Sequence, residues 1–328
     1  MKQEVGIILG SGFSHVAGLP LTKNLFEDKT KPFIKSLKAE KVYEKVKHAW
    51  EENKRNNKEV NAELWMNSIY YSINERNPTV TWDEILYYLL AKLVIIDSKS
   101  PKAVYLHGIT KSCCSKTHQS FWQHLLKKYD IKTIITTNYD ILIEQGLRNK
   151  YDRFRDAPLC YYGGLHKPQI VKRVRDVIKQ KYILTELNGD ISLCKLHGSL
   201  NWEIKDDNLY INECVHSAFR VTKKPTTAIV PPIIDKRPPK WLESIWRYAE
   251  GQLMNTKVWI VCGFALNKYD EALYNFFKNI SQKIDNLLIY LIDPQSENLA
   301  SKWKEFTKND CIINTLPGLP EVLDDDRF

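Results

Sequence analysis

Short apolar runs recur along this chain, and most of them are separated by segments with helical periodicity. The runs are continuous and do not alternate with polar residues, which is typical of strands buried on both faces of a parallel sheet. We therefore expect an α/β fold, a Rossmann-like and mostly parallel sheet with helices on both faces. The predicted strands lie at residues 5–9, 131–136, 191–196, 227–230, 258–262, 287–292 and 311–315.

The distances between these runs predict two insertions. A long segment rich in Lys, Glu, Tyr and Leu comes after the first run, and several of its stretches carry the apolar period of amphipathic helices. This predicts a large helical insertion after the first strand, at about 24–112. A second insertion, at about 150–190, is basic and irregular. We expect a single domain over residues 1–328 that carries both insertions.

The composition fits a folded protein without a disulfide framework. Hydrophobic residues make up 43% of the chain, which is enough for a sizeable core. The seven cysteines have no framework spacing, so we interpret them as reduced thiols. The sequence has no N-terminal signal region and no apolar run long enough for a bilayer, which predicts a cytoplasmic protein without membrane contact. We interpret the net charge of +9 as a solvated basic face, and direct nucleic-acid contact stays an open alternative.

The most informative feature is the short segment directly after each predicted strand. In open parallel sheets, ligands bind beyond the carboxyl ends of the strands. Any one polar segment there is explained by turn chemistry, but several at the same edge predict a ligand site. Five runs lead into glycines or polar side chains, at Gly10 to Ser14, Thr136 to Asp140, His197 to Trp202, Gly263 to Asp270, and Asp293.

The residue types in these segments suit a phosphorylated ribose ligand. Gly10 and Gly12 let a backbone approach a phosphate, with the next N–H groups free to donate to it. His197 is a candidate general base, because an imidazole exchanges protons near neutral pH. Asn138 would position a ribose hydroxyl or a water, and Asp293 would bind a ribose diol. The structural alternatives are a helix cap for Asn138 and a turn for Asp293.

Taken together, these segments resemble the signatures of the sirtuin family. "GSGFSHVAGLP" is similar to the sirtuin glycine-x-glycine-x-serine motif that ends in glycine-aliphatic-proline, and "TTNYD" to its threonine-glutamine-asparagine-isoleucine-aspartate motif. "LHGSL" and "GFAL" resemble its histidine-glycine pair and its glycine-threonine-serine-leucine phosphate turn. The matches run in order from residue 5 to about 293. The resemblance implies a sirtuin-like NAD-binding domain over the chain.

The resemblance also implies which residues meet NAD⁺ as a substrate. Asn138 would position water and ribose, His197 would deprotonate a ribose hydroxyl or activate the water, and Asp140 would contact the nicotinamide amide. The pyrophosphate would lie over the first glycine loop and the Gly263 turn. The implied cofactor-binding residues are Gly10, Ser11, Gly12, Phe13, Ser14, Thr137, Gly263, Phe264, Ala265 and Asp293.

Departures from the family pattern narrow the implied activity. The two cysteine pairs of the deacylase zinc ribbon do not occur, so we expect no zinc. Leu21, Thr22 and Lys23 replace an aspartate-phenylalanine-arginine triplet that handles the cofactor in deacylation. Thr137 and Ala265 replace a glutamine and a serine. The chain thus resembles the bacterial sirtuin-like effectors of anti-phage defence. That branch implies an NAD⁺ hydrolase that releases nicotinamide and ADP-ribose and depletes NAD⁺ in abortive infection.

Two alternative functions stay open. One is ADP-ribosyl transfer or deacylation on the same fold. The other is a non-catalytic module that senses NAD⁺ or ADP-ribose and regulates a partner. The resemblance implies control through homo-oligomerisation and through a partner such as a DNA-translocating ATPase or an Argonaute-like protein. The basic segment 167–181 is a candidate surface for a partner or RNA.

Overall fold

A parallel sheet forms the centre of the computed structural model. The structure describes residues 2–27, 37–57, 61–72, 78–93, 116–148, 159–161, 181–182, 191–205, 208–212, 227–231, 238–267 and 269–328. The central sheet has seven strands in the order β11-β10-β9-β1-β2-β5-β3, and every neighbouring pair is parallel. Its strands are β1 (Gln3–Leu9), β2 (Tyr129–Thr136), β3 (Leu159–Tyr161), β5 (Ile191–Lys195), β9 (Val258–Cys262), β10 (Leu288–Ile292) and β11 (Ile312–Leu316). The predicted parallel α/β fold is confirmed.

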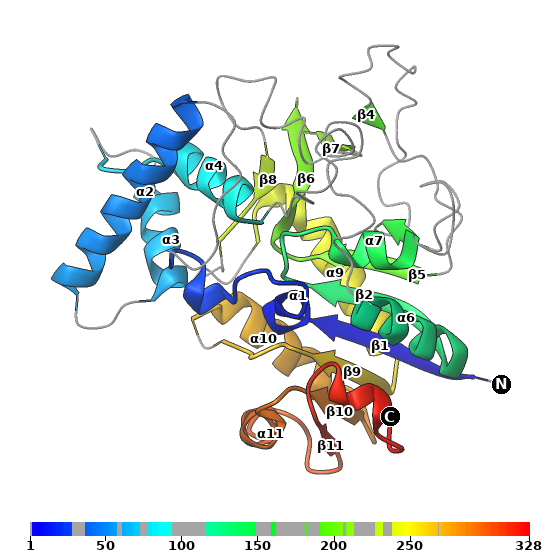
Figure 1. Cartoon of the computed structure of the whole chain (residues 1–328). Helices are drawn as coiled ribbons and strands as arrows, with labels where there is room; N and C mark the ends of the chain where they lie inside the picture. The colour runs from blue at the N-terminus through cyan, green and yellow to red at the C-terminus, as the bar shows by residue number, and fades with distance from the viewer. Residues whose placement is uncertain are drawn as a thin grey trace.

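Helices cover this sheet and explain its continuous apolar strands. Every residue of β5 and of β9 is buried, which requires cover on both faces of the sheet. Figure 1 shows helices on both sides of the strands. The helices are α1 (Ser11–His15), α2 (Leu37–Asn56), α3 (Ala62–Tyr71), α4 (Trp82–Leu93), α6 (Lys116–Lys128), α7 (Leu142–Arg148), α9 (Lys240–Met254), α10 (Glu271–Ser281) and α11 (Ser296–Lys304), with short 3₁₀ turns η1 (Thr22–Asn24) and η5 (Glu321–Asp324). None of the helices among the described residues is long and apolar enough to cross a bilayer.

Helix α10 shows how the sequence specifies these covering helices. Asp270 caps its first turn, and its side chain accepts a hydrogen bond from the Leu273 N–H group. The buried side chains Leu273, Phe276, Phe277 and Ile280 recur at helical spacing and form one apolar stripe. The stripe packs in the main core, where Phe277 contacts the rings of Trp259 on β9 and Trp303 on α11. These ring contacts tie two helices to the sheet.

A second, antiparallel sheet accompanies the central one, and the sequence patterns above do not predict it. Its order is β4-β7-β6-β8, formed by β4 (Lys181–Tyr182), β6 (Gly198–Lys205), β7 (Asn208–Asn212) and β8 (Thr227–Ile229). The run predicted at 227–230 as a strand of the parallel sheet is therefore β8 of this smaller sheet. Gly198 starts β6 with φ +83°, and a Cβ there would lie 2.0 Å from the carbonyl oxygen of Ala228. Only glycine allows this approach.

The helices α2, α3 and α4 occupy the region of the predicted helical insertion. In Figure 1 they lie together on the side to which the β1 and β2 arrows point. They build a second apolar cluster around Phe26, Trp50 and Tyr88, in which the ring of Phe26 contacts the other two. The cluster also includes Ile141 and Ile229, so these helices pack onto the strand-end side of the sheet. The predicted end of this insertion at 112 lies outside the described residues, as do most of the second insertion at 150–190 and of the basic segment 167–181.

Candidate functional site

The segments predicted to bind a ligand do begin at one edge of the sheet. Leu9 ends β1 in register with Thr136 of β2 and with Cys262 of β9. Thr136 in turn pairs with Lys195 of β5, and Cys262 with Ile292 of β10. The five strands therefore end side by side, and the five polar segments start from adjacent points.

The first glycine loop packs directly against the Gly263 turn. The Gly12 N–H group donates to the Gly263 carbonyl oxygen at 2.9 Å, and the Phe13 N–H group donates to the Gly10 carbonyl oxygen at 3.0 Å. A Cβ at Gly10 would lie 2.4 Å from the Gly263 oxygen, and one at Gly263, where φ is +59°, would lie 2.2 Å from the Phe13 nitrogen. These glycines are required because two backbones touch. In this conformation the N–H groups of Gly12 and Phe13 are therefore bonded within the protein.

A chain of hydrogen bonds joins the "TTNYD" segment to this loop. The Asn138 amide nitrogen donates to the Gly10 carbonyl at 2.8 Å and to Ser14 Oγ at 2.9 Å. Ser14 Oγ donates to Asp140 Oδ2 at 2.7 Å. The other oxygen of Asp140 accepts from the Leu142 N–H group at 3.0 Å, so Asp140, and not Asn138, supports the start of α7. Asn138 and Asp140 thus both lie at the sheet edge, joined to each other through Ser14 Oγ.

A buried ion pair lies beneath Asp140, and the sequence patterns above do not single it out. Lys195 is fully buried at the end of β5, where its ammonium contacts the Asp140 carbonyl oxygen and lies 3.2 Å from Glu144 Oε1. Burial raises the pKa of Glu144, although the Lys195 charge acts in the opposite direction. The sequence did contain a signal for this pair. Lys195 lies inside an otherwise apolar run, and a lysine that is buried with its strand needs a partner of opposite charge. This pair supports the backbone that carries Asp140.

His197 meets a carboxylate immediately after β5. Its Nε2 atom lies 2.8 Å from Asp270 Oδ2, and the two residues are 3% and 2% exposed. The contact is electrostatic, because the buried Nε2 makes no hydrogen bond in this conformation. Asp270 belongs to the polar segment expected after β9, but no role was predicted for it. The contact joins the turn after β5 to the start of α10.

A second carboxylate reaches the same place from the helical segment. Glu63, in the first turn of α3, accepts a hydrogen bond from the Asn267 amide nitrogen. Burial of its carboxyl and the negative charge of Asp270 raise the pKa of Glu63 to about 7, although His197 and the Asn267 hydrogen bond act to lower it. Removal of the Tyr139 hydroxyl from water, and then the charges of Glu63 and Asp270, raise the pKa of Tyr139. The carboxylates of Asp270 and Glu63 thus both act near His197, together with Asn267 and Tyr139.

The remaining predicted residues divide between exposed and structural positions. Phe13 and Phe264 are core side chains, and Phe264 packs on the rings of Phe277 and Trp303. Asp293 is half-buried at the end of β10, where its Oδ1 accepts from the Gln295 N–H group as a turn residue would. The side chains or backbones that reach the surface at the strand ends are Ser11, Gly12, Thr137, Gly263 and Ala265.

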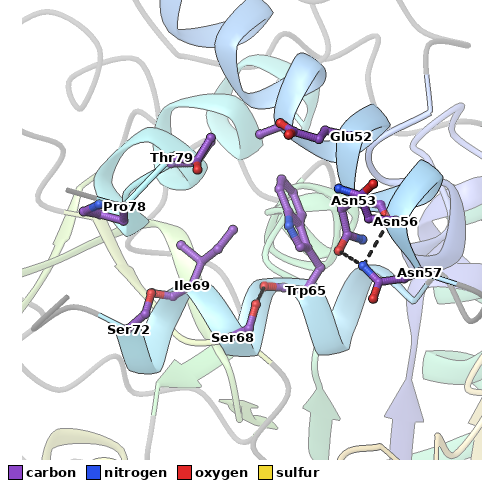
Figure 2. A pocket seen from close by; sticks show the side chains of 12 residues that line it. Glu52, Asn53, Asn56, Asn57, Trp65, Ser68, Ile69, Ser72, Pro78 and Thr79 are labelled. Atoms are coloured by element: carbon purple, nitrogen blue, oxygen red, sulfur yellow. Dashed lines mark hydrogen bonds between the residues drawn. The ribbon is translucent and has the colours of Figure 1, made fainter. Parts of the chain in front are cut away.

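A pocket of about 390 Å³ lies elsewhere, between α2 and α3 (Figure 2). Its wall includes Trp65 and three asparagines of α2 and its end. Several of its polar groups already bond within their own helices: Ser68 Oγ donates to the Trp65 carbonyl, and the Asn57 amide donates to Asn53. No lining residue comes from the strand ends, so we place the candidate site at the sheet edge and not here.

Comparisons with known proteins find likeness in structure alone. No protein family model and no curated protein matches the sequence. Within the described ranges, no group of three or more His, Cys, Asp or Glu side chains is placed to hold a metal ion. A solved structure of Sir2 with the inhibitor EX-527, 2′-O-acetyl-ADP-ribose and a deacetylated p53 peptide is 13% identical. The alignment covers 98% of this chain and 90% of that one, with a TM-score of 0.41.

A mutant Sir2 homologue in complex with 2′-O-acetyl-ADP-ribose is also 13% identical. That alignment covers 90% of this chain and 81% of the other, with a TM-score of 0.34. Likeness at this level defines neither a fold nor an activity. The parallel α/β fold described above rests instead on the strand order of this chain.

Proposed function

We propose that this chain is a sirtuin-like NAD⁺ hydrolase that cleaves the nicotinamide N-glycosidic bond. The observation that supports the proposal most is the convergence at one sheet edge of an imidazole, an amide and two carboxylates from the segments that follow β2, β5 and β9. His197 and Asp270 are in contact there, and Asn138 and Asp140 share a hydrogen-bond network with the first glycine loop. Asn138, Asp140 and His197 lie in segments that resemble sirtuin motifs, and so does the first glycine loop.

The chemistry requires little help for the leaving group. Nicotinamide leaves as a neutral molecule from a cationic pyridinium, and the transition state resembles an oxocarbenium ion. The site must hold the ribose, stabilise positive charge and supply water. In the proposed reaction, water adds to the anomeric carbon as the C–N bond breaks, and His197 accepts the proton that the water loses. The products are ADP-ribose and nicotinamide, and the proton later passes to solvent.

The other predicted residues have proposed places along the substrate. Asn138 would orient the water and the ribose, and Asp140 would contact the nicotinamide amide. The pyrophosphate would lie over the loop from Gly10 to Ser14 and the Gly263 turn, with Asp293 at the adenosine ribose. Asn138, Asp140 and His197 are nearly buried, so the nicotinamide ribose reaches them only when the segments above them shift.

By the resemblance stated above, the biological role would be NAD⁺ depletion in anti-phage defence. An enzyme of this kind must be held inactive until infection. We propose control by homo-oligomerisation and by a partner protein such as a DNA-translocating ATPase or an Argonaute-like protein. A mass measurement that finds only monomers, with full activity in the pure protein, would contradict this part of the proposal.

A non-catalytic sensor of NAD⁺ or ADP-ribose is the second candidate. Two observations favour it: the nearly complete burial of the proposed catalytic side chains, and the internal hydrogen bonds of the Gly12 and Phe13 N–H groups. A sensor would bind the nucleotide tightly without turnover. Transfer of ADP-ribose or deacylation would instead give a modified acceptor.

The experiment is product analysis by chromatography. Pure protein is incubated with NAD⁺, with and without a candidate partner, beside the variants His197→Ala and Asn138→Ala. His48→Ala is the matched control, because His48 is exposed on α2. We expect free ADP-ribose and nicotinamide from the wild type and His48→Ala, with turnover lowered about 10²–10⁴-fold in His197→Ala. Wild-type turnover in both site variants would refute the assignment, and binding without turnover under every condition would favour the sensor.

A further inference from the structure

Two carboxylates beside His197 have no part in the chemistry proposed so far. Asp270 lies at the start of α10 and Glu63 in the first turn of α3, and the chain brings them together across the sheet edge. Both act electrostatically on each other and lie near the same imidazole. Carboxylates are costly to bury together, so their placement here calls for an explanation.

Asp270 is held in a fixed orientation. One carboxylate oxygen, Oδ1, accepts the Leu273 N–H group at 3.1 Å, which is the capping bond of α10. The other, Oδ2, is thereby directed to His197 Nε2 at 2.8 Å. The start of a helix also favours a negative charge at this point. Because Nε2 is buried and makes no hydrogen bond, a small rotation of the imidazole is all that is needed to align it with Oδ2.

Glu63 is held by an equally oriented partner. The Asn267 side-chain oxygen accepts the Tyr269 N–H group at 3.1 Å, so its amide nitrogen faces outward and donates to Glu63 Oε2. Among the described residues, Tyr139 is a further titratable group near these carboxylates, and its hydroxyl donates to the Val230 carbonyl oxygen at 2.9 Å. The Asn267 contact is therefore what joins α3 to the turn that carries Asp270.

These contacts give Asp270 and Glu63 different roles beside His197. We infer that Asp270 accepts the Nε2 proton of His197, which leaves Nδ1 as the atom that takes a proton during the reaction, and that Glu63 adds a second charge that stabilises the resulting imidazolium. Asp270 and Glu63 are thus positioning residues that act through His197. The inference rests on the proposed function for its kinetic consequences, but not for the orientation of the ring. It also makes α3 of the helical segment part of the site.

The first test is the ring tautomer of His197, which needs no substrate. Histidine-labelled protein is examined by ¹⁵N NMR at pH 8.5, and the His197→Ala spectrum assigns the ring. We expect a proton on Nε2 and none on Nδ1 in the wild type. In Asp270→Asn, the side-chain oxygen still accepts the hydrogen bond that caps α10, because asparagine is a good N-cap residue. Its NH₂ group then faces His197 and donates to Nε2. The ring proton should then move to Nδ1. A proton on Nδ1 in the wild type, or one tautomer in both proteins, would overturn the assignment.

The second test is kinetic. Asp270→Asn should lower kcat about 10- to 100-fold with little change in KM, the usual effect of losing a group that orients a functional histidine. Glu63→Gln should match the wild type at pH 6, where Glu63 is mostly protonated, and fall below it at pH 8.5. The matched control is Glu84→Gln, which alters a glutamate in the first turn of α4 that pairs with Lys45 outside the site. A loss confined to KM, or a Glu63→Gln profile that parallels the wild type, would contradict the inference.

The outcomes of the two tests distinguish failure of this inference from failure of the proposed function. If the wild type cleaves no NAD⁺ under any condition, the proposed function fails, while the NMR result still decides the role of Asp270. In that case Glu63 is tested by the same spectra, because Glu63→Gln should move the His197 ring signals at pH 8.5 and Glu84→Gln should not. Normal turnover in Asp270→Asn would sink the inference and leave the hydrolase proposal standing.

Discussion

Replacement of Glu63 by glutamine should stabilise the protein in alkaline solution and leave its stability nearly unchanged in acid. The new side chain would keep an oxygen that accepts from Asn267, so the substitution removes the ionisation and little else. The pKa of Glu63 is raised from its ordinary value of 4.5 to about 7, mainly by burial and then by the charge of Asp270. The folded state therefore holds the proton more tightly than the unfolded chain does.

The sign and size of the effect are set by linkage. Between pH 4.5 and 7 the folded protein binds more protons than the unfolded chain, so its stability falls as the pH rises. The full penalty above about pH 8 corresponds to about 3.4 kcal/mol, and partial exposure of the side chain lowers our expectation to about 2–3 kcal/mol. Glu63→Gln escapes this penalty. It should unfold roughly 3–4 °C higher than the wild type at pH 8.5, and at nearly the same temperature at pH 4.

Urea unfolding at pH 8.5 and at pH 5 measures the free energies directly. Glu84→Gln is again the control, since the exposed pair between Glu84 and Lys45 contributes at most about 1 kcal/mol. We expect the difference between Glu63→Gln and the wild type to grow by about 2 kcal/mol from pH 5 to pH 8.5. An equal gain at both pH values would mean that glutamine simply packs better. A loss at pH 8.5 would refute the reasoning.

Two further predictions concern the backbone and the buried ion pair. Gly263→Ala should destabilise the fold by about 2–4 kcal/mol or abolish soluble expression, because the new Cβ would lie 2.2 Å from the Phe13 nitrogen at a residue with positive φ. A thermal melt measures this loss. The control is Gly251→Ala, since nothing lies within 4 Å of a Cβ at that position. Lys195→Met should cost about 3–5 kcal/mol by leaving Glu144 buried without its cation, and the double variant Lys195→Met/Glu144→Leu should recover much of the loss in urea unfolding. No recovery in the double variant would show that Lys195 acts through the Asp140 carbonyl alone.

Six of the seven strands of the central sheet were predictable because burial on both faces leaves a simple signal. The seventh, β3 (Leu159–Tyr161), lies in the segment that we predicted as an irregular insertion. The run at 258–262 is β9 to the residue, and β1, β2, β5, β10 and β11 differ from their predicted bounds by at most two residues at either end. The run at 227–230 looks the same in sequence but pairs with β6 in the antiparallel sheet. A clue to that sheet was present: Leu200, Trp202 and Ile204 alternate with polar residues, as a strand with one buried face does.

From the sequence, only those site residues that come shortly after a predicted strand could be predicted. Asn138, Asp140 and His197 come after apolar runs, so topology alone brings them to one edge. Asp270 lies at the start of a helix, where capping is the ordinary explanation for an aspartate. No sequence pattern indicates that it also contacts an imidazole. Glu63 is one glutamate among many on amphipathic helices, and its partner Asn267 is 204 residues away. Such a contact depends on how α3 packs on the sheet, which no local pattern encodes.

The turn after β9 unites these observations. Its first residue, Gly263, accepts the Gly12 N–H group, and its last residue, Asp270, faces His197. Any phosphate that takes the Gly12 N–H group must displace the Gly263 carbonyl, and so must move the start of the turn that carries both Asn267 and Asp270. The turn thus contacts the glycine loop at its first residue and His197 at its last. Glycine is needed on both sides of that contact for packing alone, so a glycine motif predicts close backbone approach before it predicts a ligand.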